Sequence, residues 1–260
     1  MDPFLIAEQV LLQYLNDRNN TAINECLAIE GVNVWINYPV LRELLKNPLR
    51  QFQNVKSITC LAFASLVSDD ATVRQLVEAG ADIKVRDSGG YSPLHYACVS
   101  GIDSEAKVAY LMQREHHGAL VNAADNDGRI PLHDAAEAGH VETVKLLLGH
   151  PECRVNAAAK DGRIPLHDAA KAGNVETVKL LLSHPECRVN AIGYWGSTPL
   201  RDAAEAGNVE TVKLLLSHPE YQLNLFDDLS QTLDWARQSG LYDIAALVED
   251  KSKGNLRQRL

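Results

Sequence analysis

A stretch of 34 residues is repeated almost unchanged in the middle of this chain, and no other feature limits its fold as strongly. Residues 128–161 and 162–195 differ at only seven of 34 positions, and a third copy begins at residue 196. Weaker copies flank these three, so that repeats start near residues 57, 90, 128, 162, 196 and 229. A period of this length predicts stacked supersecondary units instead of one globular core.

The spacing of the repeats is regular, with one exception. The residues that open the first helix of each repeat are 33, 38, 34, 34 and 33 positions apart. They are Thr59, Ser92, Ile130, Ile164, Thr198 and Gln231. The longer interval predicts extended helix ends or a larger loop around residues 102–105 and 113–118.

The local chemistry of each repeat predicts two short helices followed by a turn. In Ser92-Pro93 and Thr198-Pro199, a hydroxyl residue at the N-cap precedes proline at the first helical position, where its missing N–H costs nothing. Glycines follow at the place where the first helix would end in a left-handed conformation. They are Gly101, Gly139, Gly173, Gly207 and Gly240. A second helix is expected to open at Asn174 or Asn208, and a polar, glycine-containing turn closes the repeat.

These residues resemble the ankyrin repeat signature. The similarity lies in the run Ser92-Pro93-Leu94-His95-Tyr96-Ala97, its threonine version from Thr198, and the Val-Asn pairs that end at residues 122, 156 and 190. It covers residues 57–250, about six repeats. The resemblance implies an all-α solenoid of stacked helix-turn-helix units with β-turn fingers.

Some repeats depart from this pattern. Ile130 and Ile164 replace the capping hydroxyl, so each helix start is expected to lose a bond worth about 1 kcal/mol. Arg201 replaces the usual histidine, and the repeat from Gln231 is degenerate, as expected where one face of the last repeat meets water.

The two ends of the chain lie outside the clear repeats. Residues 1–56 are interpreted as a helical N-terminal capping or extension region, with helices over residues 7–15 and 21–29 and another near 40–45. Residues 25–33 look like a decayed second half of a repeat. Residues 251–260 are interpreted as a basic C-terminal tail, solvated or weakly docking.

Composition excludes several function classes. The 260 residues carry a net charge of −9, which opposes nucleic-acid binding because phosphate affinity needs a concentrated basic surface. No run of 18 apolar residues occurs, so no membrane span is expected. The N-terminus shows no signal-peptide pattern. Five cysteines, an odd number, fit a reducing compartment, so a cytoplasmic location is expected.

Catalytic and metal-binding signatures are not found in the sequence. Asp134, Asp168 and Asp202 recur one repeat apart and are interpreted as a solvated acidic ladder. The same spacing, about 8–10 Å between neighbouring helices, keeps the recurring histidines too far apart to share a metal ion. Those histidines are His150, His184 and His218. Cys153 and Cys187 are expected to be buried apolar residues, and His116-His117 a surface loop. We therefore expect no catalytic residue, metal or cofactor.

Recognition is the role that remains, on the concave surface that ankyrin fingers and first helices form. Tyr194 and Trp195 are two large aromatic residues at one turn tip, as at an interface hot spot, unless Trp195 packs onto the neighbouring finger. Arg129 and Arg163 either join a polar rim or pair with the nearby Asp127 and Asp161. The complete predicted binding set is Tyr194, Trp195, Arg86, Tyr91, Arg129, Lys160, Arg163, Lys171, Glu137 and Glu205.

The sequence therefore predicts a monomeric, non-enzymatic module that binds another protein. Three alternatives stay open. One is an ankyrin effector that an intracellular bacterium or virus delivers to the host cytosol. Another is an enzyme with a site in residues 1–56, which are few for a catalytic domain. The third is a structural homo-oligomer.

Overall fold

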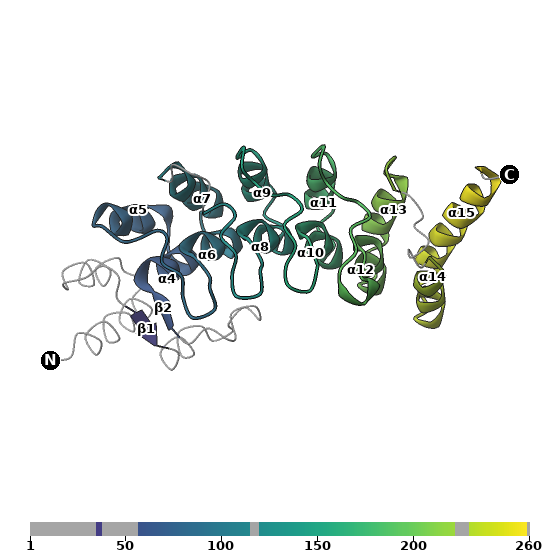
Figure 1. Ribbon diagram of the computed structural model, residues 1–260, viewed down its shortest axis with the longest axis horizontal. Helices are drawn as coiled ribbons and strands as arrows, with labels where there is room; N and C mark the ends of the chain where they lie inside the picture. Colours follow the sequence, from purple (N-terminus) through teal and green to yellow (C-terminus); the bar gives the residue numbers. More distant parts are fainter. Residues whose placement is uncertain (1–34, 38–56, 115–119, 222–228, 259–260) are drawn as a thin grey trace. The chain divides into compact units, whose positions relative to one another are not determined.

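The computed structural model describes residues 35–37, 57–114, 120–221 and 229–258 (Figure 1). They belong to two compact units, Met1–Asn126 and Asp127–Leu260. The helices predicted before residue 57 and the loop at His116-His117 lie outside the described residues. The described chain is helical, which confirms the predicted all-α class.

The described residues of the first unit form two helix pairs and one short strand pair. The described helices are α4 (Cys60–Val67), α5 (Asp70–Glu78), α6 (Pro93–Val99) and α7 (Ser104–Gln113). The strands β1 (Trp35–Asn37) and β2 (Ser57–Thr59) pair antiparallel, with Ile36 opposite Ile58. No strand was expected from the sequence. Thr59 both ends β2 and caps α4, because its Oγ1 accepts a hydrogen bond from the backbone N–H of Ala62 at 3.1 Å.

A buried lysine joins the two helix pairs of the first unit. Lys107 on α7 is fully buried, and its Nζ donates to the carbonyls of Ser65 and Ser68 at 2.8 and 3.0 Å and to Ser100 Oγ at 2.6 Å. Burial lowers the pKa of this ammonium group to about 8. The carbonyls lie at the C-terminal end of α4, where a positive charge is favourable.

The second unit repeats the helix pair three times and ends in two further helices. The pairs are α8 (Pro131–Ala138) with α9 (Val141–Leu148), α10 (Pro165–Ala172) with α11 (Val175–Leu182), and α12 (Pro199–Glu205) with α13 (Val209–Ser217). The last helices are α14 (Leu229–Gln238) and α15 (Tyr242–Gln258), so residues 251–258 continue a helix. In Figure 1, α8, α10 and α12 form one row and α9, α11 and α13 another.

The predicted starts and ends of these helices are confirmed. Proline occupies the first position of α8, α10 and α12, and Gly139 and Gly173 end α8 and α10 with φ of 74° and 75°. Thr198 Oγ1 accepts from the backbone N–H of Arg201 at 3.2 Å. Ile130 and Ile164 have no such acceptor, yet the backbone N–H of each still finds a partner in the histidine three residues later, at 3.1 Å.

Two asparagines tie successive repeats together. The sequence analysis placed Asn174 and Asn208 at the starts of α11 and α13, and they do precede these helices. Their side chains, however, donate to the repeat before: Asn174 Nδ2 lies 3.0 and 2.9 Å from the last carbonyls of α8, at Ala136 and Glu137. A Cβ at Gly139 would lie 2.6 Å from Asn174 Oδ1, so this close approach requires the glycine.

Candidate binding surface

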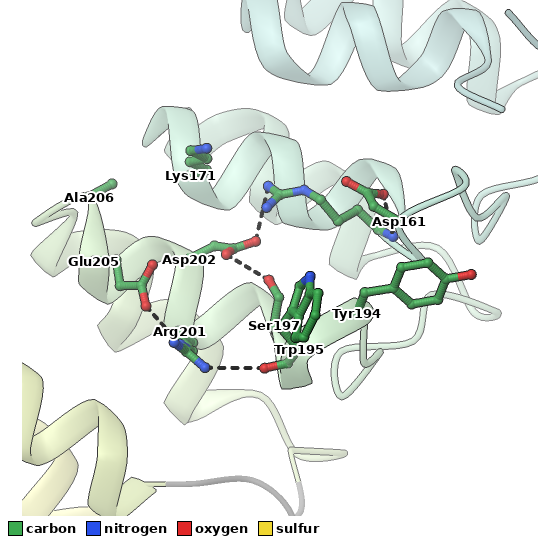
Figure 2. A pocket seen from close by; sticks show the side chains of 10 residues that line it. Asp161, Lys171, Tyr194, Trp195, Ser197, Arg201, Asp202, Glu205 and Ala206 are labelled. Carbon is green, nitrogen blue, oxygen red and sulfur yellow. Dashed lines mark hydrogen bonds and ion pairs between the residues drawn. The ribbon is translucent and has the colours of Figure 1, made fainter. Parts of the chain in front are cut away.

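Two adjoining hollows run along the first helices and fingers of the second unit. The larger, of about 400 Å³, lies between α10, α12 and the finger at residues 193–197 (Figure 2). The smaller, of about 330 Å³, lies between α8 and α10. The hollows share Asp161, Arg163 and Lys171, and together we call them the binding groove.

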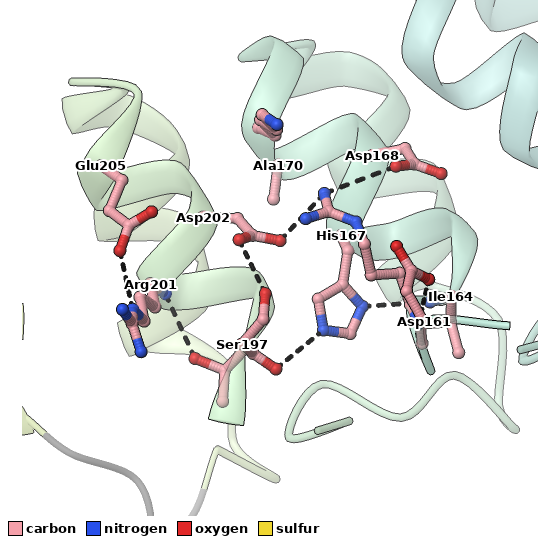
Figure 3. Close-up of polar contacts among 12 residues, drawn as sticks. Asp161, Ile164, His167, Asp168, Ala170, Ser197, Arg201, Asp202 and Glu205 are labelled. Atoms are coloured by element: carbon pink, nitrogen blue, oxygen red, sulfur yellow. Dashed lines mark hydrogen bonds and ion pairs between the residues drawn. The ribbon is translucent and has the colours of Figure 1, made fainter. Parts of the chain in front are cut away.

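The floor of the binding groove is a row of alternating arginine and aspartate side chains. Arg129 Nη2 lies 3.2 Å from Asp134 Oδ1, and Arg129 Nη1 lies 3.1 Å from Asp168 Oδ2. Arg163 Nη2 continues the row, at 3.4 Å from Asp168 Oδ1 and 3.0 Å from Asp202 Oδ2 (Figure 3). Each arginine therefore joins its own repeat to the next one.

The interpretation of these aspartates as a solvated ladder was wrong. Asp134, Asp168 and Asp202 are only 0%, 5% and 6% exposed. Arg129 and Arg163, which precede α8 and α10, pair with these aspartates and provide the partners that buried charges require. Pairing of these arginines with Asp127 and Asp161 was the other expectation, and the ion pairs form with the buried aspartates instead.

Burial and the neighbouring charges both shift the pKa values of the aspartates and of Arg129 in the floor. It raises the pKa of Asp168 and Asp202, and the neighbouring arginines partly oppose this shift. Burial alone would lower the pKa of Arg129, but the carboxylates of Asp168, Asp134 and Glu137 outweigh it and raise that pKa overall. The arginine and aspartate side chains of the floor thus form a network of ion pairs with one another.

Histidines hold the fingers against the first helices. His167 Nδ1 accepts from the backbone N–H of Ile164 at 3.1 Å, and its Nε2 lies 3.2 Å from the carbonyl of Ser197 in the next finger (Figure 3). Burial lowers the pKa of His167 to about 4 and that of His133 to about 3, so both rings are neutral at pH 7. The tautomer that carries hydrogen on Nε2 satisfies both contacts of His167. This bond positions the finger that carries the aromatic residues.

Tyr194 and Trp195 stand at the tip of that finger, at the rim of the binding groove. Tyr194 is 64% exposed and Trp195 96%, so Trp195 does not pack onto the neighbouring finger. The backbone is nevertheless fixed, because the N–H of Tyr194 donates to the carbonyl of Asp161 at 2.6 Å. Trp195 has φ 61° and ψ 18°, in the left-handed region that bulky residues avoid. An exposed indole is therefore held in an unfavourable backbone conformation.

Most of the predicted binding residues lie together, and two do not. Those that line the binding groove are Tyr194, Trp195, Arg129, Arg163, Lys171, Glu137 and Glu205. Lys160 is exposed on the finger beside it. Arg86 and Tyr91 belong to the first unit. Arg86 is exposed and donates to the carbonyl of Ala124, but placing Tyr91 on a polar rim was wrong, since its ring is 6% exposed and packs against His95 and Tyr96.

Ser197 and Arg201, on the α12 side of the groove, were not among the predicted binding residues. Ser197 Oγ donates to Asp202 Oδ1 at 2.8 Å, in the place where the two preceding repeats have an arginine. Arg201 Nε pairs with Glu205 at 2.7 Å, and its Nη1 lies 3.5 Å from the carbonyl of Trp195. Ser197 and Arg201 could both have been found from the sequence, because each replaces a residue that the two preceding repeats share.

Other kinds of site are not seen in the described part of the chain. Within residues 35–37, 57–114, 120–221 and 229–258, no three His, Cys, Asp or Glu side chains are grouped so that they could bind a metal ion. Over the same residues, no helix combines the length and apolar character that crossing a membrane requires. Cys187 is buried and Cys153 half-buried, and burial raises the pKa of each thiol to about 12.

A helix pair that recurs with the same starts and ends along the chain defines a helical repeat protein. The family model described as ankyrin repeats (3 copies) matches overlapping stretches of the chain, residues 22–125, 61–159, 106–193, 150–227 and 166–257. The chain belongs to the ankyrin repeat family, whose members are generally non-catalytic protein–protein interaction modules.

Similar stretches occur in proteins of different kinds. SMC5-SMC6 complex localization factor protein 1 of Bos taurus is 40% identical over 98 residues, which are 37% of this chain and 9% of that protein. Tyrosine-protein kinase Shark of Drosophila melanogaster is 35% identical over 111 residues, 42% of this chain and 11% of the kinase. NF-kappa-B inhibitor alpha of Sus scrofa is 34% identical over 100 residues, 37% of this chain and 31% of the inhibitor. The chain thus matches less than a third of each of these relatives.

Proposed function

We propose that this chain binds a partner protein along the binding groove, with Tyr194 and Trp195 as the main anchors. The observation that carries the proposal is Trp195, whose side chain is 96% exposed although its backbone is left-handed. Such strain persists only where the surrounding structure enforces it, and it is concentrated at functional sites. An aromatic residue at the rim of a groove is also the residue type that contributes most to binding interfaces.

The rest of the groove supports the same role. Its floor is internally paired, while its rim presents charged and aromatic side chains on both sides. Among the relatives, one is named as an inhibitor and another as a localization factor of a complex, and both names describe action on other macromolecules. We propose from these observations that the chain acts by binding and not by catalysis.

A capture experiment with paired variants tests this proposal. Wild-type protein, the double variant Tyr194→Ala with Trp195→Asn, and Tyr242→Ala are each used to capture proteins from a cell lysate. Tyr242 is the matched control, because it is 74% exposed in the same unit but lies on α15, outside the residues that line the groove. Loss of two anchors should weaken capture about 30-fold, the effect of about 2 kcal/mol.

The thermal stability of the variants separates a binding role from a packing role. Asparagine tolerates the left-handed region, so Trp195→Asn alone should stabilise the protein by up to about 1 kcal/mol. Partners that the double variant still captures as well as wild type would refute the proposal. A large fall in its melting temperature would show instead that the two aromatic residues belong to the core.

A further inference from the structure

The near identity of two successive repeats reveals an unfilled position in the binding groove. In the repeat from residue 128, Glu137 on α8 completes the surroundings of Arg129, with its Oε2 2.7 Å from Arg129 Nη2. In the next repeat the same position on α10 is Lys171, and the arginine is Arg163. A carboxylate has thus been replaced by an ammonium group while its arginine partner is kept.

The replacement leaves some N–H donors of two cationic side chains without a hydrogen-bond partner among the described residues. Arg163 uses only Nη2, for its bonds to Asp168 and Asp202, and its Nη1 and Nε make no bond to another described residue. Lys171 is exposed, and its Nζ likewise has no bond to the residues that the structure describes. Both side chains line the two hollows of the groove, so the unsatisfied donors face the space that a partner would enter.

Resting on the function proposed above, we infer that the binding groove takes an aspartate or glutamate side chain of the partner between Lys171 and Arg163. This carboxylate pairs with the guanidinium group of Arg163, as the carboxylate of Glu137 pairs with that of Arg129 in the neighbouring repeat. A charge-assisted pair with a guanidinium group is among the stronger polar contacts available. Tyr194 and Trp195 line the same hollow, so the residues next to the acid in the partner segment are aromatic or aliphatic.

The other carboxylates of the groove do not contradict this assignment. Asp168 and Asp202 are nearly buried and already paired with arginine, and Glu205 is paired with Arg201. Asp161 is exposed, but it is on the finger, and its Oδ1 accepts the backbone N–H of Arg163 at 3.1 Å. The polar groups that remain without a hydrogen-bond partner beside Lys171 are therefore the cationic N–H donors of Arg163 and Lys171.

Selection of peptides against the full chain tests the inference directly. A phage-displayed library of random 12-residue peptides is selected on wild-type protein, and the enriched peptides are synthesised with a fluorescent label. Affinity is measured by polarisation for wild type, Lys171→Glu, Lys179→Glu and Trp195→Asn. Lys171→Glu restores the residue that the neighbouring repeat carries, so the fold has a direct precedent in Glu137. Lys179→Glu makes the same charge change on α11, outside the groove.

The expected peptides contain an acidic residue beside an aromatic or aliphatic one. Lys171→Glu should weaken the binding of these peptides about tenfold, and Lys179→Glu less than about twofold. Changing the acidic residue of the peptide to its amide should weaken binding to wild type about tenfold. The same change should not weaken binding to Lys171→Glu any further. Peptides that require Trp195 but are neutral or basic would overturn this inference and leave the proposed function standing. If no enriched peptide depended on Trp195, both would fail.

Discussion

Removal of Arg129 is the sharpest test of the buried network beneath the binding groove. In Arg129→Met the apolar stem of the side chain is largely kept and the guanidinium group is lost. Asp134, which has no exposed surface, loses its ion pair with Arg129 at 3.2 Å, and Asp168 loses the nearer of its two arginines. Breaking a buried pair by removing one partner costs about 3–5 kcal/mol.

The structure places the expected loss near the lower end of that range. Arg129 is 18% exposed, its pair with Glu137 is at the surface, and Asp168 keeps Arg163. We therefore expect a loss of about 3 kcal/mol, a large part of the stability of a typical domain. Arg201→Met is the matched control, because its pair with Glu205 is 36% and 41% exposed and is worth at most about 1 kcal/mol.

Urea unfolding followed by circular dichroism measures both variants, since urea does not screen charges. The loss in Arg129→Met should shrink between pH 7 and pH 5, because burial already raises the pKa of Asp168 and removal of a cation raises it further. Protonation then neutralises the buried carboxylate of Asp168, which has lost one of its two arginines. Adding Asp134→Asn should also recover part of the loss. Equal losses below about 1 kcal/mol in Arg129→Met and Arg201→Met would refute the view that buried pairing holds these repeats together.

Three further variants probe the ties between neighbouring repeats. The pKa of His167 is about 4 in the folded chain and about 6.5 in the unfolded chain. Just below pH 6.5 only the unfolded chain gains a proton at this residue, so the stability of the wild type falls as the pH drops. His167→Gln should remove a slope of about 1.4 kcal/mol per pH unit from urea titrations between pH 6 and 4.5, and parallel curves would contradict this. Asn174→Ala loses two hydrogen bonds and should cost about 2 kcal/mol, whereas Asn190→Ala, which loses one exposed bond, should cost half as much by the same measurement.

The local elements of this fold were predictable because local interactions form them. A proline at the first helical position and a glycine at the left-handed end act through a few adjacent residues. Both predictions are confirmed in α10, which begins at Pro165 and is capped by Gly173. Gly101 is the exception: it has no positive φ, and α6 ends at Val99 with Ser100 extended. The strand pair at residues 35–37 and 57–59 was missed, since three residues are too few for a period to be recognised.

The candidate site was only partly predictable, for a related reason. Comparison of near-identical repeats identified Trp195 and Lys171, because a changed residue on a constant scaffold is visible in one sequence. Tyr91 was misplaced, because nothing in the sequence says whether an aromatic residue in a finger points outward or into the repeat. The proposals for the N-terminal region and the basic tail remain predictions.

The period of the repeats, the proline that opens most of their first helices and the residues on which near-identical repeats differ could be read from the amino-acid sequence. Only the tertiary structure decided which charges are buried and with which partners they pair. Arg129 and Asp168 are far apart in sequence, and their contact depends on how two successive first helices stack. Burial between those helices lowers the local dielectric, and this turns an apparently solvated aspartate into one that requires an arginine of the preceding repeat.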